Sequence, residues 1–270
     1  MKVPPIFATP LGAIGIAHRG SRLLWPENTA AAFKGAASLG YRRFETDLRL
    51  TADGVLVCFH DPVLSRTTNG HGFLASATFD QVRRLDAGYR HRLEDGFPFR
   101  GQGIAVPTFA EMATMFPDAG WVLDLKADGT EEPLAAVIKE LGLADQVIVG
   151  SFSNERVERF RQFTVGRVAT STPPWETLRA MIAAASPGQE RGRGREGGVF
   201  DPTTCALQVP ATWYGVPVVS RKLVMLAHAA ERLVHVWTVN SIDEVSSLTD
   251  LGVDGLITDR PDLVSPGPVE

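Results

Sequence analysis

Short apolar runs alternate with helical patterns along the sequence, and this alternation constrains the fold more than any other feature. Eight runs have the length and composition of strands, and helical stretches lie between most of them. These runs cover residues 13–17, 42–48, 121–126, 146–151, 165–170, 205–209, 234–239 and 253–258. Alternation of this kind predicts a parallel sheet. Eight strands with no leftover half-domain favour an α/β fold of the closed TIM (β/α)8 type over an open, doubly wound sheet.

Helices are predicted between these strands. Their expected ranges are 27–39, 78–86, 108–116, 131–141, 153–163, 174–185 and 221–232. In one of them Thr108 stands three residues before Glu111, which is the spacing of a capping box. The chain has 270 residues, and barrels of about 250 residues routinely form one domain. We therefore expect a single domain over residues 1–270.

A ninth apolar run, residues 55–60, does not fit the alternation. It follows the second strand too closely to be a parallel neighbour, because a parallel crossover needs about a dozen residues. The dipeptide Asp53-Gly54 is a strong signal for a two-residue hairpin turn. We therefore expect residues 47–60 to form an antiparallel hairpin that continues the second strand.

The expected turn fixes which side chains face each other across this hairpin. If Ala52 faces Val55, then Asp47 faces His60. Directly opposed side chains share one face of the sheet, with Cβ atoms about 5 Å apart. Glu45 points the same way as Asp47 because side chains alternate along a strand. Two carboxylates and an imidazole are thus predicted to converge.

Two long stretches lack the barrel periodicity. Residues 61–107 are expected to form an inserted subdomain that makes a lid or rim beside the site, because so long a loop in a compact domain is usually functional. Residues 187–198 alternate Arg and Gly. That composition is compatible with RNA binding, but a flexible solvated loop is the preferred interpretation.

Composition excludes several classes of protein. Apolar residues make up 44% and charged residues 21% of the chain, which excludes a disordered chain. The 27 Lys and Arg against 31 Asp and Glu give a net charge of −4, so we expect no nucleic-acid partner. Cys58 and Cys205 lie in apolar stretches and are expected to be core residues rather than a disulfide or metal pair.

The chain is expected to work in the cytoplasm without stable membrane insertion. No apolar stretch approaches the length of about 18 residues that spans a bilayer, and prolines interrupt the apolar run near the N-terminus. The sequence gives no indication of the oligomeric state.

Chemically active side chains stand at the expected C-terminal ends of the strands, where barrel enzymes carry their catalytic groups. They are His18 and Arg19, Glu45 and Asp47, Asp124 and Lys126, and Trp237. Arginine suits bidentate recognition of phosphate. Paired carboxylates without cysteine favour Mg²⁺ or Ca²⁺ over Zn²⁺. The alternatives are a solvated strand edge with salt bridges to neighbouring arginines, and outward-facing surface positions for Asp124 and Lys126.

The order of these parts resembles the glycerophosphodiester phosphodiesterase family. HRG at 18–20 is followed by PENT at 26–29, ExD at 45–47, TxDG at 51–54 and HD at 60–61. Weaker matches continue to DGLITDRPD at residues 254–262, so the resemblance covers about residues 18–262.

The resemblance implies a TIM barrel with an insertion after its second strand. It implies hydrolysis of glycerophosphodiesters, which are small-molecule substrates, to glycerol 3-phosphate and an alcohol with one divalent cation, Mg²⁺ or Ca²⁺. His18 and His60 resemble the acid/base pair, with His18 expected as the base and His60 as the acid. The other matching positions resemble metal ligands at Glu45, Asp47 and Asp124, and substrate-binding residues at Arg19, Lys126 and Trp237.

One position departs from the family pattern, and one motif residue is not assigned to catalysis. Asp124 stands where the family usually has Glu, and the shorter side chain changes how a third metal ligand reaches the ion. Glu27 resembles a structural residue that opens the first helix.

Two rival functions remain open from the sequence. A lysophospholipase D or sphingomyelinase-D-like phosphodiesterase needs an apolar groove. Six aromatic residues offer one: Phe73, Phe79, Phe97, Phe99, Trp213 and Tyr214. A non-catalytic phosphodiester-binding barrel is the other alternative, and Asp124 motivates it.

Overall fold

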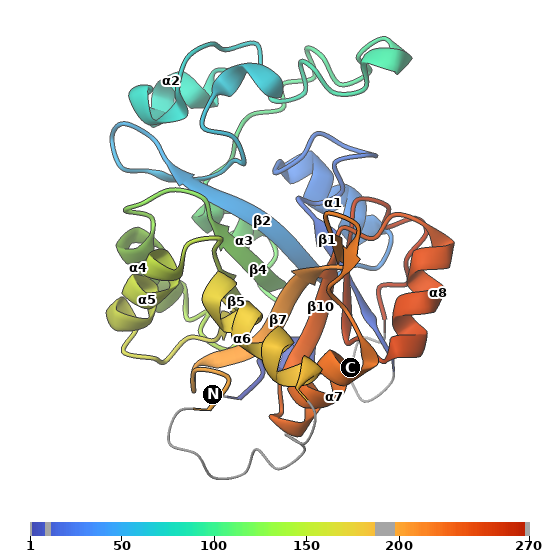
Figure 1. Ribbon diagram of the computed structural model, residues 1–270. Helices are drawn as coiled ribbons and strands as arrows, with labels where there is room; N and C mark the ends of the chain where they lie inside the picture. Colours follow the sequence, from blue (N-terminus) through green and yellow to red (C-terminus); the bar gives the residue numbers. More distant parts are fainter. Residues whose placement is uncertain (1, 9–11, 187–197, 268–270) are drawn as a thin grey trace.

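Eight parallel strands close into a barrel in the computed structural model, which describes residues 2–8, 12–186 and 198–267. Each strand pairs with the next, and the last strand pairs with the first (Figure 1). The barrel strands are β1 (Ile14–His18), β2 (Arg43–Leu50), β4 (Gly120–Leu125), β5 (Val147–Gly150), β6 (Thr170–Ser171), β7 (Thr204–Pro210), β10 (Leu233–Trp237) and β11 (Gly255–Thr258). The predicted (β/α)8 fold is therefore confirmed.

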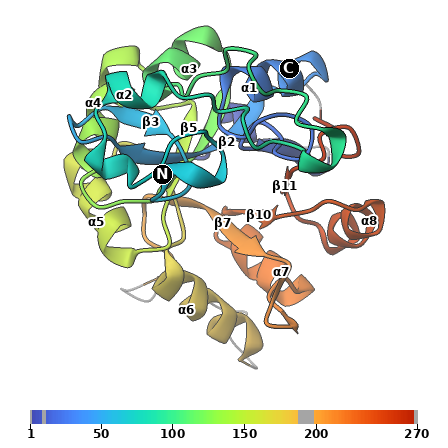
Figure 2. The same ribbon diagram turned by 90° about the horizontal axis from the view of Figure 1, so that it is seen from above.

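Helices cover the outside of the barrel (Figures 1 and 2). They are α1 (Ala30–Ser38), α3 (Phe109–Met115), α4 (Glu131–Leu141), α5 (Asn154–Phe163), α6 (Pro174–Ala185), α7 (Arg221–Ala229) and α8 (Ile242–Leu251). The predicted capping box of Thr108 and Glu111 opens α3. Helix α8 was not predicted, although Ser241 and Glu244 form a capping box that marks its start.

The apolar core has two layers. Inside the barrel, Phe7 from the short N-terminal 3-10 helix η1 (Pro5–Phe7) packs in one buried cluster with Ile16 and Ile257. Between the strands and the helices, Trp121 of β4 packs edge-on against Phe33 of α1, with ring centroids 5.2 Å apart. Each large apolar side chain buried in this way contributes roughly 1.5–3 kcal/mol, so the two layers hold the strand ends in place.

Strand β6 is shorter than predicted. The apolar pattern indicated a strand over 165–170, but only Thr170 and Ser171 are in strand conformation. Val165 and Gly166 have φ angles of +51° and +63°, and Val165 is 78% exposed. These two residues therefore turn the chain after α5 instead of starting the strand.

The hairpin after β2 exists, but the predicted register is wrong by one residue. Strand β3 (Leu56–Cys58) pairs antiparallel with β2, and Leu48 faces Cys58. The amide of Phe59 donates to the carbonyl of Asp47 at 2.8 Å. Asp47 is therefore paired with Phe59 rather than with His60.

The cause of this error is the turn. Thr51 pairs with Val55, so three residues rather than two form the loop. Gly54 has a φ of +77° and occupies the left-handed position that closes a three-residue hairpin. The hydroxyl of Thr51 donates to a carboxylate oxygen of Asp53 at 2.6 Å and holds the loop. The Asp-Gly pair predicts a hairpin equally well for either loop length.

Residues 61–107 lie at the C-terminal ends of the barrel strands, over the β2 and β3 side (Figures 1 and 2). They carry helix α2 (Phe79–Arg83) and the 3-10 turns η2 (Leu64–Arg66), η3 (Leu74–Ser76) and η4 (Leu93–Asp95). Leu64, Leu74 and Val82 form an apolar cluster of their own with Phe59. This cluster anchors the segment to the hairpin.

A short ribbon that was not predicted follows β7. It consists of β8 (Thr212–Trp213) and β9 (Val216–Pro217). The Arg- and Gly-rich stretch 187–198 lies, except for its last residue, outside the described residues. Both cysteines are buried and free, as predicted. None of the helices in the described residues is long and apolar enough to cross a bilayer.

Candidate active site

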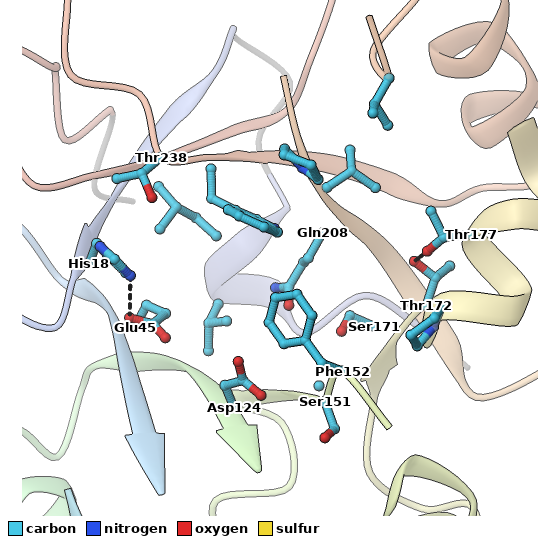
Figure 3. A pocket seen from close by; sticks show the side chains of 18 of the residues that line it. His18, Glu45, Asp124, Ser151, Phe152, Ser171, Thr172, Thr177, Gln208 and Thr238 are labelled. Atoms are coloured by element: carbon cyan, nitrogen blue, oxygen red, sulfur yellow. Dashed lines mark hydrogen bonds and ion pairs between the residues drawn. The ribbon is translucent and has the colours of Figure 1, made fainter. Parts of the chain in front are cut away.

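A cavity of about 690 Å³ lies at the C-terminal ends of the strands (Figure 3). Seven of the eight predicted site residues line it: His18, Arg19, Glu45, His60, Asp124, Lys126 and Trp237. The eighth, Asp47, is 1% exposed and contacts Arg19 and Lys126. The structure therefore brings all eight together.

Strand pairing places the acidic side chains beside one another. Glu45 and Asp47 are two residues apart on β2 and so point the same way. On the neighbouring strand Asp124 is level with Asp47, and on the other side His18 is level with Glu45. Three carboxylates and an imidazole thus meet because three adjacent parallel strands are in this register.

Two cations compensate the buried carboxylates. Nε of Arg19 lies 3.0 Å from Oδ2 of Asp47. Nζ of Lys126 lies 3.2 Å from Oδ1 of Asp47 and 2.5 Å from Oδ2 of Asp124. The backbone amide of Arg19 donates to Glu45 at 3.0 Å, and the side chain of Arg19 also contacts Glu27. Arg19 has a φ of +54°, the left-handed geometry of the turn after β1.

The three buried carboxyl groups differ in pKa. Burial and the neighbouring Asp47 raise the pKa of Glu45 to about 7. Burial would raise the pKa of Asp47 too, but Arg19 and Lys126 hold it well below its usual range. Burial also raises the pKa of Asp124, although Lys126 opposes the shift. Glu45 is therefore the carboxylate that most needs another positive charge.

His18 is held by a carboxylate from the opposite end of the chain. Its Nδ1 lies 2.7 Å from Oδ1 of Asp259, which is fully buried and also accepts from Nε of Arg22 at 2.9 Å. The Nε2 of His18 lies 3.7 Å from Glu45. Burial lowers the pKa of His18, but Glu45 and the hydrogen bond to Asp259 outweigh it, so the pKa lies above its ordinary value.

His60, like His18, is held by a carboxylate at Nδ1. Its Nδ1 lies 2.5 Å from Oδ1 of Asp61, and Asp61 is paired with Arg66 of the insertion. Arg66 also binds Glu27, which ties the insertion to the segment after β1. Burial lowers the pKa of His60, and the nearby Asp47 only partly restores it. Each imidazole thus has Nδ1 engaged by an acid, which leaves Nε2 for a substrate.

The side chains at this end of the cavity have the chemistry of a site for a hard divalent cation, but not its arrangement. Three carboxylates face one another, and Oδ1 of Asp124 is buried without a hydrogen-bond partner. Oxygen ligands are those that Mg²⁺ and Ca²⁺ prefer. Within the described residues, no group of three or more His, Cys, Asp or Glu side chains is placed so that it could hold a metal ion. Lys126 bridges Asp47 and Asp124, and its ammonium group would have to move aside.

Two residues of the site were not assigned from the sequence. Asn28 donates from Nδ2 to Asp47 at 2.9 Å and accepts from Thr46, so it orients the carboxylate. It belongs to the PENT motif, which was the available signal. Asp259 follows the last strand, and closure of an eight-stranded barrel puts that strand beside β1. Closure was therefore the signal for its contact with His18.

These features define a class: a (β/α)8-barrel enzyme with paired imidazoles, acids and cations at one end of its cavity. Residues 18–263 match the model of the glycerophosphoryl diester phosphodiesterase family. The chain is 35% identical over 254 residues to "Probable glycerophosphodiester phosphodiesterase 2" of Mycobacterium tuberculosis, covering 94% of this chain and 89% of the relative. It is 30% identical to a glycerophosphodiester phosphodiesterase of Caldanaerobacter subterraneus, covering 92% and 94%.

Solved structures give the same result. A phosphodiesterase of Oleispira antarctica, in complex with the product sn-glycerol-3-phosphate, superposes with a TM-score of 0.70 at 25% identity, covering 93% of this chain and 94% of that one. A domain of a Mycobacterium tuberculosis protein gives a TM-score of 0.80 at 19% identity, covering 93% and 97%, and shows the shared fold. The chain belongs to the glycerophosphoryl diester phosphodiesterase family, and it is an enzyme of that family.

Proposed function

We propose that the protein hydrolyses glycerophosphodiesters to glycerol 3-phosphate and an alcohol, with His18 and His60 as its acid/base pair. One observation carries the proposal: both imidazoles line one cavity with Arg19 and Lys126, and each has Nδ1 bound to its own carboxylate. The product in the Oleispira antarctica structure supports the choice of substrate class.

Arg19 and Lys126 are the proposed phosphate ligands, and Trp237 is a further substrate contact. A phosphodiester carries negative charge that repels nucleophiles, so its non-bridging oxygens need compensation. The guanidinium and ammonium groups stand at one end of the cavity and supply two positive charges there.

Glu45, Asp47 and Asp124 are the proposed ligands of one divalent cation, Mg²⁺ or Ca²⁺. When bound, such an ion compensates charge on the phosphate oxygens. The raised pKa of Glu45 and the unpartnered Oδ1 of Asp124 support a further positive charge at this point. Asp124 takes the place of a longer Glu, and its strand position level with Asp47 supports its inclusion among the proposed ligands.

The two histidines divide the proton transfers. His18 takes a proton from the nucleophile, and His60 donates one to the oxygen of the departing alcohol. Each transfer contributes typically about 10²–10⁴-fold in rate. Neutralisation of Glu45 lowers the pKa of His18 toward the form that accepts a proton, and a bound phosphodiester raises the pKa of His60 toward the form that donates one. Both shifts favour the proposed roles.

The insertion, residues 61–107, is proposed to form a subdomain within the single domain of the chain and to support the site. Arg66 links Asp61, behind one histidine, to Glu27, which contacts Arg19. Of the two alternative functions, a non-catalytic phosphodiester-binding barrel is not favoured, because the chain belongs to a family of enzymes. The lysophospholipase D or sphingomyelinase-D-like alternative differs in its substrate, so a comparison of glycerophosphocholine with lysophosphatidylcholine separates it from the proposed function.

The test is a glycerol 3-phosphate release assay with Mg²⁺ or Ca²⁺, run on glycerophosphocholine, glycerophosphoethanolamine and glycerophosphoglycerol. We expect release from at least one substrate, and loss of release in His18→Ala and His60→Ala with unchanged circular dichroism. His228→Ala is the matched control, because His228 is an exposed histidine on α7. Near-normal turnover in either site variant refutes the role given to that histidine.

A further inference from the structure

An arginine stands behind the carboxylate that holds His18. Nδ1 of His18 lies 2.7 Å from Oδ1 of Asp259, and the other carboxylate oxygen, Oδ2, accepts a hydrogen bond from Nε of Arg22 at 2.9 Å. Nδ2 of Asn240 donates to the same Oδ2 at 3.3 Å. Arg22 lies in the turn after β1, and its side chain is 44% exposed. It therefore reaches from the protein surface to a fully buried carboxylate.

The same atoms recur behind His60. Its Nδ1 lies 2.5 Å from Oδ1 of Asp61, and Oδ2 of Asp61 accepts a hydrogen bond from Nε of Arg66. Arg66 is the last residue of the 3-10 turn η2 in the insertion. We call each set of imidazole, carboxylate and guanidinium a triplet. The first triplet is His18, Asp259 and Arg22, and the second is His60, Asp61 and Arg66.

The arginine of each triplet fixes the orientation of the carboxylate. A carboxylate bound through one oxygen can still rotate about χ2, because that torsion has broad minima. A guanidinium on the second oxygen sets the plane of the group and so the direction in which Oδ1 faces the imidazole. Burial would raise the pKa of Asp61 and of Asp259, but the hydrogen bonds from imidazole and arginine hold both pKa values below the ordinary range. Each carboxylate therefore stays ionised and can only accept, so Nδ1 of its histidine carries a proton.

Arg66 has a second acid, which Arg22 lacks among its described contacts. Nη1 and Nη2 of Arg66 donate to the two carboxylate oxygens of Glu27 at 2.8 and 2.6 Å. Oε1 of Glu27 also accepts from Nη1 of Arg19 at 3.0 Å. The planar fork of Arg66 thus spans Asp61 and Glu27, which the single ammonium group of a lysine would not match. One guanidinium is therefore linked both to an acid/base histidine and to a proposed phosphate ligand.

The insertion holds both arginines. Leu64, at the start of η2, is buried in the apolar cluster of the insertion and so anchors the turn that carries Arg66. Farther along the insertion, Nε2 of His91 donates to the backbone carbonyl of Arg22 at 3.0 Å. Neither arginine is among the described residues that line the cavity. Each can therefore act on the reaction only through its partners.

We propose that Arg22 and Arg66 are positioning residues for the acid/base pair, each fixing the carboxylate behind one imidazole. The inference rests on the proposed function, in which His18 accepts a proton from the nucleophile and His60 donates one to the departing oxygen. Loss of Arg22 should therefore weaken activation of the nucleophile. Loss of Arg66 should weaken protonation of the leaving group.

The experiment compares two diesters that differ in their need for a general acid. Glycerophosphoethanolamine has an alkanol leaving group that needs a proton, whereas 4-nitrophenol, in glycerophospho-4-nitrophenol, is a far stronger acid and departs as its anion. Arg22→Met and Arg66→Met remove each guanidinium and keep a long side chain. Arg83→Met is the matched control, because Arg83 of the insertion forms a partly exposed ion pair with Glu111 of α3. Circular dichroism and melting curves check that each variant folds.

The two variants should respond differently to the leaving group. In Arg66→Met we expect kcat to fall about 10–10²-fold on glycerophosphoethanolamine, because a hydrogen bond to a charged group is lost, but less than about threefold on the 4-nitrophenyl diester. Arg22→Met should lower kcat by the same factor on both diesters, about tenfold, because Asn240 still donates to Oδ2 of Asp259. KM should rise only in Arg66→Met, since Arg66 is the one linked to Arg19 through an acid.

The outcomes separate the inference from the proposed function. Equal losses of kcat on the two diesters in Arg66→Met, or unchanged turnover in either arginine variant, overturn the inference alone. A loss that depends on the leaving group in Arg22→Met and not in Arg66→Met supports both positioning residues but reverses the order of the two histidines. Failure of the unmodified enzyme to release glycerol 3-phosphate from either diester overturns the proposed function, and the positioning roles with it.

Discussion

Replacing Asp259 with Asn tests whether the carboxylate behind His18 positions it for catalysis. The substitution keeps the shape of the side chain but removes its charge, and the Asn amide offers a donor or a weaker acceptor to Nδ1 of His18. A hydrogen bond to a charged group contributes about 1.5–3 kcal/mol. Because each 1.4 kcal/mol is a factor of about ten, kcat should fall about 10–10²-fold if the contact is realised in the transition state.

The pH profile adds a second measurement that a purely structural role would not change. Burial lowers the pKa of His18, and Glu45 and Asp259 raise it. Removal of the Asp259 charge therefore lowers this pKa. If His18 is the base, the acidic limb of the kcat/KM profile moves to lower pH.

The assay is steady-state release of glycerol 3-phosphate from the best short diester between pH 5 and 9. KM should change little, because the substitution leaves the proposed phosphate ligands Arg19 and Lys126 in place. Asp262→Asn serves as the matched control, since Asp262 is partly exposed and pairs with Arg260 away from the cavity. An unaltered kcat together with an unmoved acidic limb would show that Asp259 does not act through His18.

Three further predictions follow from the same geometry. Chelation with EDTA should abolish turnover, and Mg²⁺ or Ca²⁺ should restore it; turnover that persists in EDTA contradicts the cation site. Because the pKa of Glu45 is about 7, the cation concentration that gives half-maximal activity should fall about tenfold per pH unit up to pH 7 and then level off. Lys126→Met should lower kcat/KM by about 10²–10³-fold, whereas Lys139→Met on the exposed side of α4 should not; equal activities would refute the phosphate role. Gly54→Ala should lower the free energy of unfolding, measured by urea titration, by about 1–2 kcal/mol. The cause is the φ of +77° alone, since an added Cβ meets nothing within 4 Å. An unshifted urea midpoint would contradict the three-residue loop.

The fold was predictable because a parallel barrel strand is buried on both faces and reads as a continuous apolar run. That signal identified all eight barrel strands. It failed for the length of β6, where Val165 looks like a strand residue but takes a left-handed turn conformation. Backbone conformation at one exposed residue leaves little trace in an apolar pattern.

The site was predictable at the level of strand ends and less so at the level of contacts. Asp47 was expected to face His60, and the three-residue loop shifted the register so that it pairs with Phe59 instead. His60 still lines the cavity because β3 has ended at Cys58, so the alternation of the strand no longer fixes its direction. The contact between His18 and Asp259 depends on barrel closure, which local patterns do not contain.

Barrel closure between β1 and β11 also sets when His18 gains its carboxylate partner as the chain folds. His18 and Asp259 are separated by 241 residues, and β1 lacks one neighbour until β11 has been made. A chain that has not yet formed β11 therefore carries an open sheet, and Nδ1 of its His18 has no carboxylate partner. The contact that holds His18 is therefore made only when the barrel closes, so a partly folded chain should lack it.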